Sequence, residues 1–182
     1  PLVMLSAFSF TSCLTTMAVN SVSSALAGAD KKGIAKKQSK PTPVEQTAMF
    51  ALTGETDVTL VADFFPTALK LYEIILTQNP EHLGLLKMTG SLNVMYGNAF
   101  VQTPAEELGV IDFEKQNEEY ARATLHYLRG RDRCLKALNG RHPGFTNAMF
   151  SQNPETIQKA CKALDKNDVD ACYWAAAGWL AA

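Results

Sequence analysis

The amino-acid sequence predicts an all-α fold, and three observations lead to this prediction. Apolar residues from Val58 to Gln102 recur at spacings of three and four, the period of helices that bury one face. A second long helical pattern runs from Asp112 to Leu138. Hairpin signals and long β-branched runs are nearly absent, and Asn139-Gly140 follows a helical pattern, where it indicates a helix end.

Length and composition indicate one globular domain. The chain has 182 residues, of which 47% are hydrophobic and 19% charged, enough for a real core. The formal net charge of -1 does not indicate the basic surface that binding of nucleic acid requires. We expect a single all-helical domain over residues 13–182. Because the chain starts with Pro and its last helical pattern has no stop signal, we expect the N-terminal part of a longer domain, truncated at the C-terminus.

The N-terminal segment, residues 1–12, is uncharged and apolar, and we interpret it as the remnant of a secretory signal peptide. Bulky Phe10 and small Ser12 precede Cys13 in the pattern of a lipobox, which predicts lipidation of the Cys13 thiol. Two other interpretations stay open. Cys13 could lie buried in an apolar helix, or the uncharged run 1–29 could span a membrane, although its Ser and Thr content disfavours this.

The next segments precede the predicted core. Residues 15–27 form a weak amphipathic pattern that ends at Gly28. Residues 29–43 are rich in Lys, which favours a solvated loop over a patch that binds anionic lipid. Residues 44–52 are a short apolar helix or turn, and 53–57 form a loop into the first core helix.

The two core helices follow in order. Thr56 or Asp57 should cap the first, and Pro66 inside it should kink the helix or mark a restart. Asn79 should cap the second helix, with Pro80 in its first turn, and this helix should run from about residue 81 to 101. It is apolar almost all round, so we expect other helices to surround it. Thr103-Pro104 should end it.

The C-terminal half should hold three more helices. The helix over 112–138 should stop between Gly140 and Pro143, and shorter helices should follow at 154–164 and 170–182. In the last of these, Tyr173, Trp174, Ala177 and Leu180 form an apolar stripe that the chain itself does not cover.

Candidate ligand or pore residues lie on the apolar second helix. They are Asn93, Tyr96, Asn98, Phe100 and Gln102. Buried amides need hydrogen-bond partners, which a solvent-filled channel would supply; hydrogen bonds between packed helices would supply them equally well.

The other chemistry-bearing residues give no catalytic arrangement. The three histidines are scattered without metal-ligand spacing, and no Ser or Cys has a placed base, so we expect neither an enzyme nor a cofactor. Cys161 and Cys172 flank a short turn and could form a disulfide in an exported protein; small buried thiols are the alternative.

The chain also contains a diverged internal repeat. A long helix that ends near Asn79-Pro80, followed by a helix with Gly90 in its middle, resembles tetratricopeptide repeats, in which small residues let helices approach closely.

Six stretches in chain order carry a more specific resemblance. They are MAVNSVSSALAG after Cys13, LVADFFPTALKLYEIILTQNPEHLGLL, GSLNVMYGNAFVQTPAEEL, LHYLRGRD from Leu125, ALNGRHPGF, and DV followed by YWAAAGW. The sequence resembles the T component of TRAP-type transporters, the TatT family of periplasmic lipoproteins.

This resemblance implies an all-helical fold with cryptic tetratricopeptide-like hairpins. It implies a non-enzymatic periplasmic subunit, lipid-anchored to a bacterial membrane, that assembles as a homotrimer with a TRAP-type periplasmic substrate-binding protein. It further implies a pore that helps to pass a hydrophobic small molecule. The alternative is a helical-repeat scaffold lipoprotein with no ligand.

Overall fold

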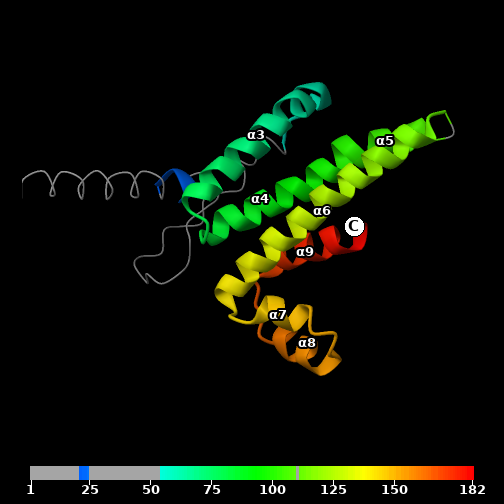
Figure 1. Ribbon diagram of the computed structural model, residues 1–182. Coiled ribbons are helices and arrows are strands. Elements are labelled where there is room, and N and C mark those ends of the chain that lie inside the picture. Colours follow the sequence, from blue (N-terminus) through cyan, green and yellow to red (C-terminus); the bar gives the residue numbers. More distant parts are fainter. Residues whose placement is uncertain (1–20, 25–53, 110) are drawn as a thin grey trace, which may run out of the picture.

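The computed structural model describes residues 21–24, 54–109 and 111–182. The ordered elements are α3 (Val58–Gln78), α4 (Leu83–Tyr96), the π-helix η2 (Gly97–Gln102), α5 (Thr103–Leu108), α6 (Phe113–Arg141), α7 (Phe145–Met149), α8 (Pro154–Cys161) and α9 (Val169–Ala181) (Figure 1). The described residues contain no strand, so the predicted all-α class is confirmed. The expectations for residues 1–12, Cys13, 29–43 and 44–52 lie outside the described residues, and residues 21–24 are helical.

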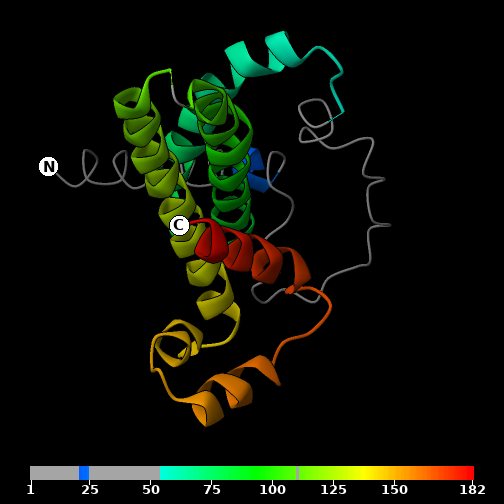
Figure 2. The ribbon, with the colours of Figure 1, turned by 90° about the vertical axis from the view of Figure 1, so that its right-hand side faces the viewer.

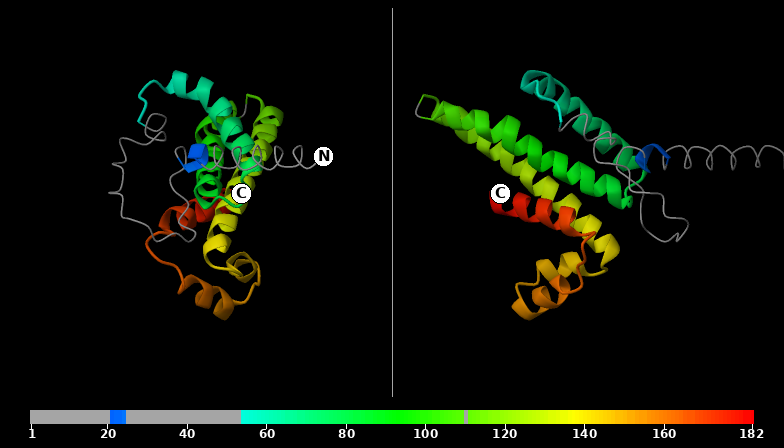
Figure 3. Two further views of the ribbon diagram at one scale, coloured as in Figure 1. Left: turned by 90° about the vertical axis from the view of Figure 1, so that its left-hand side faces the viewer. Right: turned by 180° about the vertical axis from the view of Figure 1, so that it is seen from behind.

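The core of the molecule is a long helical hairpin. The continuous rod of α4, η2 and α5 packs along α6, and α9 packs against α6 and α4 (Figure 1). On the hairpin's far side α3 packs on α4. The short helices α7 and α8 lie beyond the C-terminal end of α6, at the opposite end of the molecule from α3 (Figures 2 and 3).

Apolar side chains of α3, α4, η2 and α6 form the larger hydrophobic cluster. Leu85, Leu92 and Tyr127 are each at most 1% exposed, and Trp174 of α9 packs against them. A second cluster joins the last turns of α6 to α7 and α9. The apolar helix α4 is therefore surrounded by others, as its sequence predicts.

Glycines set the spacing of the helices. A Cβ atom built on Gly90 would lie 2.5 Å from Cys134 Sγ and 2.9 Å from the Gly130 carbonyl oxygen. One built on Gly130 would lie 2.8 Å from the Gly90 carbonyl oxygen. The α4 and α6 backbones thus cross at paired glycines. Gly178 of α9 repeats the arrangement, because its Cβ would lie 2.7 Å from the Tyr127 carbonyl oxygen.

The turn between α3 and α4 differs from its prediction. Asp57 does cap α3, through hydrogen bonds from the Thr59 and Leu60 amides. Asn79 does not begin α4; its N–H binds the Ile75 and Leu76 carbonyls, which ends α3. The α4 cap is His82, whose Nδ1 accepts the Leu85 N–H at 3.1 Å.

Neither internal proline breaks its helix. Pro66 lies inside an uninterrupted α3, so of the two predicted outcomes, a kink or a restart, the restart is wrong. The prediction that Thr103-Pro104 ends the second core helix is also wrong, since the helical rod continues to Leu108. The backbone widens into a π-helical turn just before the proline, where the Thr103 N–H donates to the Asn98 carbonyl five residues back. This wider turn accommodates Pro104, which has no N–H to donate and needs room for its ring.

The C-terminal helices are close to their predicted positions. Asp112 caps α6, which ends at Arg141, three residues past the predicted Leu138. The predicted helix from Pro154 ends at Cys161 rather than Leu164. The uncovered stripe on α9 is partly covered: Trp174 and Ala177 pack on the core, whereas Leu180 is 90% exposed.

A buried carboxylate holds the start of α9 in place. Asp168 is 1% exposed and accepts hydrogen bonds from Arg141, from His142 Nε2 at 2.8 Å and from the Asp165 amide at 2.8 Å. Arg141 also pairs with Asp165 at 3.0 Å. The hydrogen bond from the Asn167 backbone amide, followed by that from the Arg141 guanidinium, holds the pKa of the exposed Asp165 carboxyl down at about 2. These bonds tie the α8–α9 connection to the end of α6.

Candidate functional site

The strongest candidate site is an apolar pocket between α3, the α4–η2 rod, α6 and α9. Its volume is about 680 Å³, within the usual range for pockets that bind small molecules. Residues from all four parts of the fold line it: Glu55, Val58, Val61, Phe65, Val94, Met95, Asn98, Ala99, Phe100, Tyr127, Tyr173, Trp174, Ala177 and Ala181.

Aromatic rings and aliphatic side chains form most of the wall. Phe65 and Phe100 pack with their ring centroids 5.5 Å apart, and Tyr173 meets Trp174 edge to face at 4.9 Å. Among the described residues of the lining, Glu55 is the only carboxylic acid and none is Lys, Arg or His. These residues can therefore bury an apolar molecule, but they provide no acid–base pair for a reaction.

The π-helix supplies the polar edge of the pocket. Tyr127 donates its hydroxyl hydrogen to Gln102 Oε1, and Gln102 Nε2 donates to Glu106 at 3.1 Å. Burial raises the pKa of the Tyr127 phenol above its ordinary value, although a hydrogen bond with Asn98 opposes this. π-Helical turns often occur at functional sites, and here one brings Asn98 and Gln102 to the same tyrosine.

The five predicted ligand residues divide between two places. Asn98 and Phe100 line the pocket, and Gln102 reaches its edge through Tyr127. Asn93 and Tyr96 lie instead within the α4–α6 interface.

The polar groups of that interface bind one another. Asn93 donates to the Thr89 carbonyl at 2.8 Å and its Oδ1 lies 3.1 Å from His126 Nδ1. The Tyr96 hydroxyl accepts a hydrogen bond from Arg122 at 2.8 Å. Burial, followed by the charges of Arg129 and Arg122, lowers the pKa of His126 to about 4.

Sequence reasoning missed the other walls of the pocket. Val61 and Phe65 of α3 and Tyr127 of α6 belong to apolar helical stripes that look like ordinary core. Trp174 and Ala177 were recognised only as an uncovered stripe on α9. Nothing in a single sequence shows that these three helices enclose one space, because the pocket depends on how they pack.

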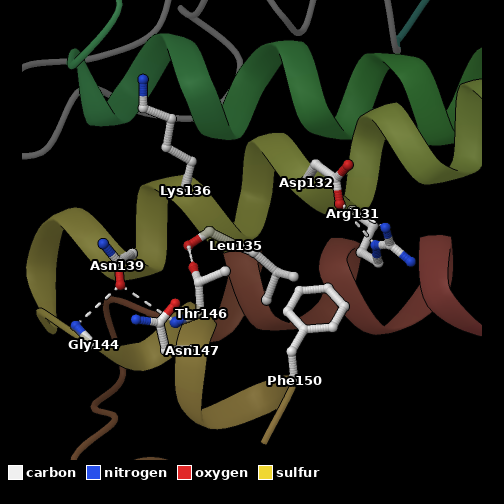
Figure 4. Close-up of a pocket in the computed structure, with 9 residues that line it drawn as sticks. All are labelled: Arg131, Asp132, Leu135, Lys136, Asn139, Gly144, Thr146, Asn147 and Phe150. Atoms are coloured by element: carbon white, nitrogen blue, oxygen red, sulfur yellow. Dashed lines mark hydrogen bonds and ion pairs between the residues drawn. The ribbon is translucent and has the colours of Figure 1, made fainter.

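A second, more polar pocket of about 560 Å³ lies between α6 and α7 (Figure 4). Asn139 Oδ1 accepts hydrogen bonds from the Gly144 and Thr146 amides, at 3.0 and 3.3 Å. The Arg131 guanidinium pairs with Asp132 and lies over the ring of Phe150, 5.4 Å from its centroid. Because these groups already satisfy one another, this pocket is the weaker candidate.

The three cysteines in the described part of the chain show no reactive arrangement. Cys161 and Cys172 are both free thiols, so the predicted bridge between them is not formed in this structure, and the pairing stays a prediction. Burial raises the pKa of the Cys134 thiol to about 12, which keeps it protonated and unreactive. No group of metal-ligating side chains occurs among the described residues.

Fold and pocket together define a class of protein: an all-helical protein with an apolar pocket. Comparison with known proteins narrows the class. The family model of the TRAP transporter T-component matches residues 54–182, and the chain belongs to this family. The family is a transport component, an extracytoplasmic part of its transporter. In the described part of the chain, no helix has the length and apolarity needed to cross a membrane.

The chain is also similar to an uncharacterised protein of Treponema pallidum (strain Nichols). The two are 45% identical over 130 residues, which is 71% of this chain. The aligned part covers 40% of that relative's length.

Proposed function

We propose that this chain is the lipid-anchored periplasmic T subunit of a TRAP-type transporter. In this role it binds a TRAP-type periplasmic substrate-binding protein and helps to pass a hydrophobic small molecule. Membership of the family supports the transporter role. The observation that supports binding of a hydrophobic ligand is the pocket of about 680 Å³, whose wall is mostly aromatic and aliphatic.

An apolar ligand would gain affinity mainly by leaving water. Burial contributes about 25 cal/mol for each Å² of apolar surface removed from solvent. A pocket with a mostly aromatic and aliphatic wall adds few hydrogen bonds to this. In the described lining, Asn98, the Tyr127–Gln102 pair, Glu55 and the polar ends of Tyr173 and Trp174 offer the polar contacts. Such a site suits reversible capture and release of an apolar molecule.

Filling the pocket tests the ligand. Ala99 lines it and is exposed, so Ala99→Trp adds bulk to the pocket without displacing the buried core. We expect this variant to lose binding of an apolar fluorescent probe, measured by titration, while its melting temperature stays near that of the wild type. Ala121→Trp, at an exposed site on α6 outside the pocket lining, is the matched control and should bind normally.

A scaffold without a ligand gives a different result. In that case neither the wild type nor Ala121→Trp would bind the probe, and Ala99→Trp would still bind the partner protein. Probe binding that survives Ala99→Trp unchanged would place the ligand elsewhere.

The anchor is tested at Cys13, which lies outside the described residues. Metabolic labelling with a fatty acid should label the native protein and leave Cys13→Ala unlabelled. Equal labelling of both proteins would contradict the lipid anchor at Cys13.

A further inference from the structure

We propose that the apolar pocket selects amphiphilic cations, meaning alkyl amines or quaternary ammonium compounds with an apolar chain, over anions of the same length. This inference rests on the proposed ligand binding and adds the charge of the ligand. It follows from the charge, the ring content and the layout of the pocket wall.

The charge of the wall is negative. Among the described residues, the lining contains one carboxylate, Glu55, and no basic side chain. Glu55 is held in place because its Oε1 accepts the amide hydrogens of Thr56 at 2.7 Å and Asp57 at 3.0 Å. Both bonds use the same oxygen. Glu55 makes no ion pair with a described residue, so no cation of the described part of the chain neutralises its charge.

The rings of the wall favour a cation as well. Five aromatic side chains line the pocket, namely Phe65, Phe100, Tyr127, Tyr173 and Trp174. The face of an aromatic ring is electronegative and attracts ammonium groups, most strongly where water is excluded. Elsewhere this protein already uses the interaction, since Arg122 lies 5.7 Å from the Tyr96 centroid and Arg131 lies 5.2 Å from that of Trp179. In the described residues no arginine or lysine lies over the five pocket rings.

An anion finds little support in the same pocket. Burying a carboxylate away from water is costly unless donors or a counter-ion compensate for the lost hydration. The Tyr127 hydroxyl hydrogen is already donated to Gln102, and the other side-chain donors of the described lining are neutral, namely the Asn98 amide, the Tyr173 hydroxyl and the Trp174 indole N–H. The described wall therefore offers a carboxylate no counter-ion, and it carries the negative charge of Glu55.

The layout of the wall also orients the ligand. Glu55 is exposed and lies three residues before the start of α3, whose residues Val58, Val61 and Phe65 also line the pocket. Val58 is 71% exposed, whereas Phe65 is 4% exposed and packs on Phe100. The charged head of the ligand therefore lies at the mouth beside Glu55, and the apolar chain extends towards Phe65.

Matched amphiphiles test the charge selection. The probes are decyltrimethylammonium, decanoate and the neutral decyl maltoside, each titrated below its micelle concentration. The readout is the fluorescence of Trp174 in a Trp179→Phe chain, which leaves one tryptophan and keeps a ring at position 179. We expect the cation to bind about tenfold more tightly than the anion, with the difference shrinking as salt is added.

The three probes separate the two proposals. Equal binding of cation and anion, or tighter binding of the anion, would overturn the charge selection and leave the apolar ligand of the proposed function standing. Failure of all three probes to bind would overturn the proposal that this pocket binds an apolar ligand, and the charge selection with it.

A matched pair of variants tests Glu55. Glu55→Gln should weaken binding of decyltrimethylammonium severalfold and leave decyl maltoside unchanged. Glu107→Gln removes an exposed carboxylate outside the pocket lining and should bind all probes like the parent chain. An unchanged preference in Glu55→Gln would overturn the role of this carboxylate. Thermal melts of both variants check that each remains folded.

Discussion

At Gly90 the absence of a side chain is what lets α4 and α6 touch. The nearest neighbours of a built Cβ include the Gly130 carbonyl, which is backbone and cannot rotate away. We therefore expect Gly90→Leu to destabilise the fold by about 2–3 kcal/mol through overpacking, read as a lower melting temperature. Asn117→Leu, at an exposed position on α6, is the control and should be nearly neutral. A normal melting temperature for Gly90→Leu would contradict the close crossing.

His126 should make the stability of the fold depend on pH. Its pKa is about 4 in the folded protein and about 6.5 in an unfolded chain, so the unfolded chain takes up the proton first as the pH falls. Stability is fully present above pH 6.5 and is lost progressively down to about pH 4. Because the ring is half-exposed, we expect a loss of about 1–2 kcal/mol, less than the full shift would give.

Replacing the ring tests this assignment. His126→Gln keeps a donor for Asn93 Oδ1 but cannot titrate, so denaturant melts at pH 7 and pH 4.5 should differ less than they do for the wild type. If the variant loses as much stability as the wild type over this range, another group is responsible. The exposed Asp165 acts only at lower pH, since its stabilising charge is lost as the pH falls from about 4 to about 2.

Among the elements, α9 depends on one buried carboxylate. Asp168→Ala leaves Arg141 and His142 without their shared partner, and breaking a buried pair of this kind costs about 3 kcal/mol. We expect the α8–α9 connection to loosen and the fluorescence of Trp174, which packs on the core from α9, to shift towards that of an exposed ring. Asp170→Ala breaks only the exposed pair with Lys87 and should cost less than about 1 kcal/mol. Equal effects of the two substitutions would show that Asp168 does not anchor the helix.

The sequence predicts these elements well where periodicity and caps agree. Asp57 and Asp112 are good N-caps before long amphipathic patterns, and both helices begin where expected. The errors arise where two rules compete. Asn79-Pro80 has the chemistry of a helix start, but the Asn79 amide binds the preceding turn. Pro104 normally ends a helix, and no propensity rule shows that a π-turn will absorb it.

The candidate site was less predictable than the elements. Asn98 and Phe100 were found because polar and aromatic residues on an apolar helix are unusual. Asn93 and Tyr96 share that signal, yet their polar atoms meet His126 and Arg122 in the hairpin. Only the rotation of α4 against α6 separates the two groups, and rotation is a property of packing.

For the whole molecule, the outer face of α3 is the surface we propose for the partner protein. Leu60, Phe64, Leu71 and Ile74 lie on one side of this helix and are each at least half exposed. Exposed apolar patches of this kind mark interaction sites. We expect Leu71→Glu combined with Ile74→Glu to abolish capture of the TRAP-type substrate-binding protein in a pull-down, because the charges would be buried in the contact.

A charge change on another helix controls this test. Leu125→Glu alters an exposed apolar residue of α6 and should leave capture intact. If the α3 double variant still captures the partner, the partner binds another face. If the wild type captures no substrate-binding protein, the proposed partner is wrong.

The way α3 is attached has a mechanical consequence. It meets α4 at their shared turn, and its N-terminal end stands away from the hairpin (Figures 1 and 3). Side chains of α3 and of the hairpin line the apolar pocket between them. Apart from its packing on α4, it is tied to α6 by the ion pair of Glu73 with Arg129, at 3.5 Å. Its 21 residues make a lever of roughly 30 Å, so a turn of about 10° at the hinge would carry Val58 through about 5 Å. A docked protein that rotates α3 slightly from its outer face would thus change the width of the apolar pocket on its inner face.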